Sequence, residues 1–149
     1  MITATHLHAM LIHFPIALLL VGFLSEVISL ITKKAFFKNA AIYLLLLGAL
    51  GTTASYLSGN VAGEGIEAGA LKNAIELHEQ AATTSLWLSI ITAIIYLVVA
   101  LTKYKKVWTS VVSVVLFTAM IFSIARTGYL GGQLVYKHGA GVELLLPDF

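Results

Sequence analysis

The chain contains no cysteine. This absence excludes disulfide bonds, thiolate metal sites, iron–sulfur clusters and the covalent attachment of a c-type haem. Any metal ligand must therefore be a histidine, a methionine or a carboxylate. Charge is also scarce, because 11% of the residues are charged, against about 25% in soluble domains. With 59% hydrophobic residues and a mean hydropathy of +0.95, the composition predicts an integral membrane protein in a lipid bilayer.

Several functional motifs are also missing. The sequence has no phosphate-binding glycine loop, no nucleophile motif and no basic stripe for nucleic acid, so an electron-transfer protein or subunit is favoured over a stand-alone enzyme. Most of the 149 residues lie in apolar runs, which leaves room for a single transmembrane domain over residues 1–149. The segment from Met1 to Thr5 lacks Lys and Arg, and the apolar run after it is too long for a signal peptide. We therefore interpret it as the first membrane span.

Four apolar segments are long enough to cross a bilayer. They run over about 7–31, 40–57, 81–101 and 107–130, close to the roughly 17–25 residues that a spanning helix needs. Backbone groups in hydrocarbon must be hydrogen-bonded within their own segment, and no alternation of period two suggests a barrel. We therefore predict an all-α fold, an integral membrane four-helix bundle.

Charge placement predicts the orientation of this bundle. The first and third connections carry six of the nine Lys and Arg residues: Lys33, Lys34, Lys38, Lys103, Lys105 and Lys106. By the positive-inside rule, these connections are cytoplasmic. The middle connection, residues 58–80, is acidic and is expected outside, as are both termini and the tail 131–149. We thus expect a multi-pass protein of the bacterial inner membrane whose site faces the periplasm or exterior.

This topology collects all five histidines on the outer side. His6, His8 and His13 belong to the first span, His78 lies at the entrance of the third, and His138 follows the fourth. Ionisable residues in such segments are candidates for a functional site. At 100° per residue, His8 and His13 lie about 140° apart and should face different neighbours. The alternative is that each is an interfacial histidine bonded to backbone or water.

Two further features of the first span carry expectations. Pro15 should kink the helix and free the carbonyl of Leu11. Glu26 is expected to reach toward the cytoplasmic surface or to pair with a loop lysine, and a proton path or a quinone contact is the alternative.

The outer end of the fourth span suits a flat or anionic partner. Gly128, Gly131 and Gly132 leave space for a planar macrocycle, although close helix packing explains them equally. Arg126, the only arginine, suits a haem propionate or a glutamate of the middle connection.

These residues support three functional hypotheses. The first is a b-type cytochrome-like electron-transfer protein with one or two haem b groups held by His8, His13, His78 and His138, of which His13 and His78 are favoured. The second is a zinc or copper site built from three or four of the same histidines with Glu79 or Met10 in support. The third is a cofactor-free accessory subunit of a respiratory complex. A quinone, an extracytoplasmic c-type cytochrome, a respiratory complex and a homo-oligomer are the partners considered.

Two motifs resemble a known family. His8-x-x-x-x-His13-Phe14-Pro15-Ile16-Ala17-Leu18 and Gly131-Gly132-x-Leu134-Val135-Tyr136-x-His138-Gly139-x-Gly141-Val142, with His78 opening the third span, are similar to the small four-helix bacterial membrane proteins grouped as domain of unknown function 2231. In that family the first histidine is usually followed by proline, where this chain has Ala9. Related proteins are sometimes joined to c-type cytochrome modules, so the resemblance implies an electron-transfer setting.

Overall fold

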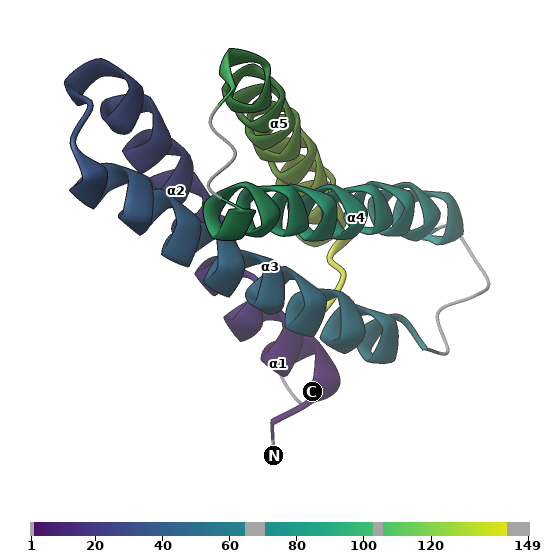
Figure 1. The fold of residues 1–149 in the computed structure, drawn as a ribbon. Coiled ribbons are helices and arrows are strands. Elements are labelled where there is room, and N and C mark those ends of the chain that lie inside the picture. Colours follow the sequence, from purple (N-terminus) through teal and green to yellow (C-terminus); the bar gives the residue numbers. More distant parts are fainter. Residues whose placement is uncertain (1, 65–70, 103–105, 143–149) are drawn as a thin grey trace, which may run out of the picture.

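The computed structural model describes residues 2–64, 71–102 and 106–142. All regular structure in these ranges is helical. The helices are α1 (Ala4–Leu11), α2 (His13–Thr32), α3 (Ala35–Gly63), α4 (Lys72–Thr102) and α5 (Val107–His138). Because α1 and α2 together form one apolar stretch, four segments are long and apolar enough to cross a membrane. The predicted all-α architecture of four long helices is confirmed (Figure 1).

A break at Ile12 separates α1 from α2. Proline lacks an amide hydrogen, and its ring pushes away the carbonyl four residues earlier, which for Pro15 is that of Leu11. The helix accordingly stops at Leu11 and resumes at His13, and the bond from Ile16 N to Ile12 O is long, at 3.5 Å. The disturbance expected from Pro15 therefore takes the form of this break in the helix at Ile12.

The closest packing joins α2 to α3 through small residues. A Cβ added at Gly48 would lie 2.5 Å from Cδ2 of Leu19, and one added at Gly51 would lie 3.2 Å from Cβ of Pro15. Leu19 is fully buried and belongs to a core with Phe117 of α5. Glycine on α3 thus lets the two backbones approach where hydrocarbon offers no hydrophobic force between helices.

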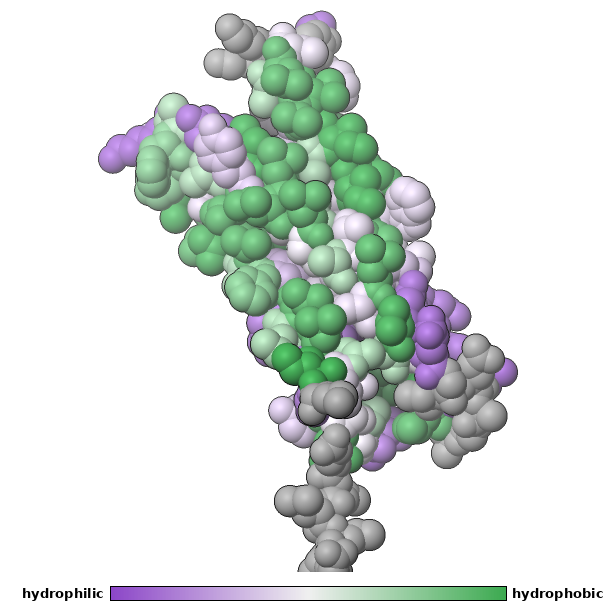
Figure 2. Space-filling view, turned by 90° about the horizontal axis from the view of Figure 1, so that it is seen from below, coloured by the Kyte–Doolittle hydropathy of each residue, from purple (hydrophilic) through white to green (hydrophobic). Residues whose placement is uncertain are grey.

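The helices alternate in direction, so each end of the bundle carries ends of several helices (Figure 1). We call the end where α1 begins, α3 ends, α4 begins and α5 ends the histidine end. The opposite end, with Lys33, Lys34, Lys38 and Lys106, is the lysine end. Apolar side chains cover most of the face in Figure 2, and hydrophilic residues lie toward its margins. This distribution fits a molecule surrounded by lipid along its middle.

Helical structure extends well beyond the apolar spans. α3 continues to Gly63 and α4 begins at Lys72, so helix covers much of the connection expected over 58–80. Polar residues such as Asn60 and Glu76 remain compatible with a helix once water replaces lipid around it. His78 therefore lies within α4 rather than at its entrance.

Candidate functional site

His8 is held against α3 at the histidine end. Its ring is half-buried, and its Nδ1 lies 3.0 Å from the carbonyl oxygen of Ser55 and 3.1 Å from Oγ of Ser58. Because a carbonyl only accepts, Nδ1 carries the proton, and Nε2 keeps its lone pair in the neutral ring. Gly59 provides the space, since a Cβ there would lie 2.9 Å from Cε1 of His8.

His78 is held in the same way by the other helix pair. From α4, its Nδ1 donates to the carbonyl oxygen of Thr127 on α5 at 3.2 Å. A Cβ at Gly131 would lie 3.1 Å from Cε1 of His78. The Thr127 hydroxyl is itself fixed by Ser85 at 2.9 Å, and Ser85 also bonds Ser123 at 2.8 Å. This network braces the carbonyl that orients the ring.

The two imidazoles form a matched pair. Each Nδ1 is bound to a helix carbonyl, and each ring lies on a glycine. Among the residues that the structure describes, neither Nε2 has a hydrogen-bond partner, and the backbone of α1 approaches neither α4 nor α5 closely. Two neutral imidazoles from separate helix pairs thus present free ligand atoms at one end of the bundle.

His13 has different surroundings from His8, as the angular spacing predicts. Its ring is exposed, and Nδ1 bonds the carbonyl oxygen of Ala9 in its own turn at 2.7 Å. His8 and His78 thus bond to neighbouring helices, whereas His13 bonds within its own turn. The reason is the 140° between the two positions, which turns His8 toward α3 and His13 outward.

The remaining candidates lie at exposed positions or next to open space. His138 is the last residue of α5 and is exposed, as is Arg126. A Cβ at Gly128 or Gly132 would meet nothing within 4 Å. Of the three glycines proposed from sequence, Gly131 alone contacts a candidate histidine.

The turn after α5 folds back toward the helix that carries His8. Gly139 caps α5 with a φ of 64°, and Gly141 follows with a φ of 76°. A Cβ at Gly141 would lie 2.7 Å from Cγ2 of Thr5 in α1. Both positions use the left-handed conformation that glycine adopts without strain. The family-like motif at the end of α5 therefore joins the two halves of the histidine end.

Sequence reasoning missed Gly59, Ser55, Ser58 and Thr127. Ser55 lies near the predicted end of the second span, and Ser58 and Gly59 lie beyond it. Ser55 and Gly59 are four residues apart on a helix, which puts them on one face. That spacing was the available signal.

The positions of these side chains give less support to a zinc or copper site. Within the described ranges, no three His, Asp or Glu side chains gather as a metal-holding group, whereas zinc sites need three or four protein ligands. Met10, considered as a supporting ligand, is 60% exposed.

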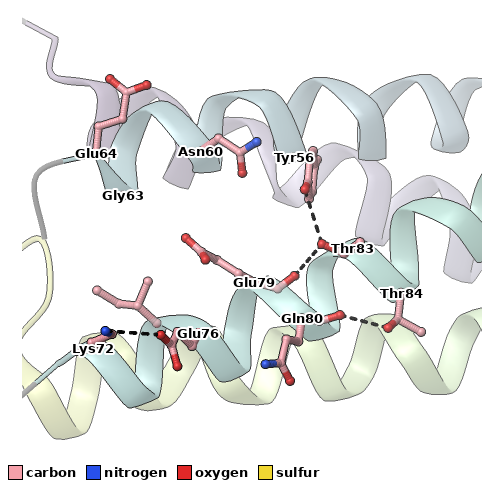
Figure 3. Close-up of a pocket in the computed structure, with 11 residues that line it drawn as sticks. Tyr56, Asn60, Gly63, Glu64, Lys72, Glu76, Glu79, Gln80, Thr83 and Thr84 are labelled. Atoms are coloured by element: carbon pink, nitrogen blue, oxygen red, sulfur yellow. Dashed lines mark hydrogen bonds and ion pairs between the residues drawn. The ribbon is translucent and has the colours of Figure 1, made fainter. Parts of the chain in front are cut away.

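An acidic cleft opens between the ends of α3 and α4 (Figure 3). It has a volume of about 840 Å³. Glu79 extends into the space between the helices, and Thr83 donates to the Tyr56 hydroxyl at 3.3 Å. Glu64 and Glu76 also line it, and Lys72 lies 3.9 Å from Glu76. The cleft gives the histidine end a negative surface.

Comparison with known proteins agrees with the motifs and the fold. The family model described as "Predicted membrane protein (DUF2231)" matches residues 4–144. No curated protein and no solved structure matches the chain. Since the match covers nearly the whole sequence and the structure has the expected four long apolar helices, the chain belongs to the DUF2231 family of membrane proteins.

Proposed function

We propose that this protein is a b-type cytochrome-like electron-transfer protein that holds one haem b between His8 and His78. The observation that carries the proposal is the identical anchoring of the two rings, in which Nδ1 donates to a helix carbonyl and Nε2 has no described partner. Metal-ligating histidines characteristically donate their second ring N–H to a carbonyl or carboxylate, which fixes the tautomer and raises the basicity of the ligand atom.

The residues around the pair have distinct roles in this proposal. Haem supplies one-electron chemistry when bound, and two imidazole ligands leave no open position for oxygen. The Ser55 and Thr127 carbonyls hold the His8 and His78 rings in fixed orientations. Gly131 and Gly59 let the rings lie close to the helix backbones. Arg126, exposed on α5 one residue before Thr127, suits a propionate.

The acidic cleft favours the binding of a positively charged redox partner at the histidine end. Carboxylates of Glu64, Glu76 and Glu79 would attract a positively charged extracytoplasmic carrier such as a c-type cytochrome and speed its encounter. A quinol pool or a respiratory complex in the membrane is the proposed electron donor. Three ligands for zinc or copper do not come together in the described ranges, so the small-ion alternative is not preferred.

We further propose that the histidine end faces the periplasm or exterior of a bacterial inner membrane. The lysines at the opposite end support this orientation. Because the chain has no cysteine, a single Asn60→Cys substitution at an exposed position of α3 reports its side. An impermeant thiol reagent is expected to label this variant in spheroplasts, where only the inner membrane separates reagent from cytoplasm. Labelling only after lysis would show that the histidine end faces the cytoplasm, and it would contradict the proposed orientation.

The direct test is spectroscopic. Protein expressed with sufficient haem supply and purified in mild detergent is expected to show a sharp b-type α band in the reduced-minus-oxidised spectrum. A pyridine haemochrome assay should give about one haem per chain. A colourless protein with stoichiometric zinc or copper would contradict the proposal in favour of a small-ion site. A colourless, metal-free protein would favour the accessory subunit.

A second prediction concerns the glycine under His8. Gly59→Ala places a methyl group 2.9 Å from Cε1 of the ring, so the imidazole must move and its bond to Ser55 must lengthen. We expect roughly a tenfold loss of haem affinity, the lower end of the effect of disturbing a ligand's supporting shell. Gly132→Ala is the matched control, because its Cβ meets nothing within 4 Å. Equal haem titrations for the two variants would contradict the proposed role of Gly59.

A further inference from the structure

A buried ion pair joins α2 to α3 in the lysine half of the bundle. Glu26 of α2 is fully buried, and its Oε1 lies 2.7 Å from Nζ of Lys38 on α3. The Lys38 side chain is 38% exposed. One partner is thus enclosed by the protein, and the other reaches toward the surface. The expected pairing of Glu26 with a loop lysine is confirmed.

The ion pair leaves several buried oxygens without partners. Among the described residues, Oε2 of Glu26 and the hydroxyls of Tyr96 and Thr92 have no hydrogen-bond partner. Tyr96 neighbours Glu26, and a small movement lets its hydroxyl donate to the carboxylate. The Lys38 ammonium lies 4.7 Å from the centroid of the Tyr96 ring. Thr92 lies one helical turn away on the same buried face of α4. Buried polar groups without partners are unfavourable, so the ion pair with Lys38 does not by itself account for this set.

We propose that Glu26 is a proton-binding site of the bundle interior and that Lys38 connects it to water at the lysine end. In the observed arrangement the carboxylate is balanced by the ammonium. A proton from water converts the carboxylate to a carboxylic acid, and the Lys38 ammonium then moves into solvent. The interior is neutral in both states, which is the condition a low-dielectric environment imposes on a buried ionisable group.

The unpaired oxygens are the groups that would hydrogen-bond to Glu26 once it is protonated. A carboxylic acid has an O–H donor that the carboxylate lacks, and the Tyr96 hydroxyl is the neighbouring acceptor, directly or through one water. A water bound between Oε2, Tyr96 and Thr92 would satisfy groups that the ion pair leaves unmet, as buried waters commonly do. The cluster of Glu26, Tyr96 and Thr92 is therefore suited to binding a proton.

Few other ionisable groups act on Glu26. Lys38 faces it from α3 and Tyr96 from α4. From α5, Phe117 packs on Tyr96 with ring centroids 5.6 Å apart, and the buried polar residues of that helix segment, Thr109 and Ser113, do not titrate. Lys33, Lys34 and Lys106 are exposed at the same end. No acidic residue precedes Glu64 in the sequence apart from Glu26.

Infrared titration of the full chain in lipid nanodiscs tests this proposal without reference to haem. On acidification, the wild type is expected to gain one carboxylic acid band that Glu26→Gln lacks and that Glu79→Gln, the exposed control, retains. Tyr96→Phe should keep this band but shift its frequency, because the acid loses its hydrogen-bond partner.

The proposal is overturned if the difference between the wild type and Glu26→Gln contains only carboxylate bands at every pH at which both remain folded. An unshifted band in Tyr96→Phe would overturn the role assigned to Tyr96. Circular dichroism establishes that each variant is folded. Should Glu26→Gln fail to fold, Glu26→Asp serves in its place, since a shorter acid must move the band if Glu26 is its source.

Discussion

His8→Ala and His78→Ala are each expected to abolish the b-type absorption band of the purified protein. Either substitution removes one of the two imidazoles that would hold the haem, and a single remaining axial ligand does not give a stable six-coordinate site. The ring anchors make the effect specific, because each Nδ1 is already bound to a carbonyl at 3.0 or 3.2 Å. The measurements are the reduced-minus-oxidised spectrum and the pyridine haemochrome content, with circular dichroism to establish folding.

His13→Ala and His138→Ala are the matched controls for this experiment. Both residues are exposed in the structure, and His13 bonds the carbonyl of its own turn. Their variants should keep the full haem content. Loss of the band in His13→Ala with retention in His8→Ala would restore the pairing of His13 with His78 that the sequence favoured and would overturn the pair proposed from the structure.

Lys38→Met is expected to lower the free energy of unfolding by about 3 kcal/mol. Breaking a buried ion pair on one side leaves an uncompensated group, which typically costs 3–5 kcal/mol, and the partial exposure of Lys38 places the effect at the low end. Without its ammonium, the Glu26 carboxylate must stay charged in a low-dielectric interior or take up a proton, and both states are unfavourable at neutral pH. Reversible unfolding in mixed detergent micelles measures the change.

The double variant Glu26→Gln with Lys38→Met should recover most of this loss, because no unpaired charge remains inside the bundle. Lys34→Met is the surface control, since Lys34 is exposed at the same end and its substitution should change stability by less than about 0.5 kcal/mol. Equal losses in Lys34→Met and Lys38→Met would show that the net charge of the lysine end, and not the pair with Glu26, determines the stability.

Much of the fold was predictable because lipid imposes simple requirements on a chain. Backbone groups must bond within each apolar segment, so the runs up to Ile31 and from Val107 onward had to be helices. The break before Pro15 followed from its missing amide hydrogen. The helix ends were less predictable, because residues such as Gly63 and Lys72 lie where hydropathy no longer constrains the backbone.

The sequence by itself determined the four long apolar helices, the break at Ile12 and the gathering of the histidines at one end, because these follow from hydropathy, local backbone chemistry and alternating helix direction. Only the tertiary structure decided which histidines bond to neighbouring helices. Spacing along one helix places His8 and His13 on different faces, but the choice between them depends on which face meets α3, where Gly59 leaves room for a ring. Contacts between helices distant in sequence, such as Glu26 with Lys38 and His78 with Thr127, arise from packing.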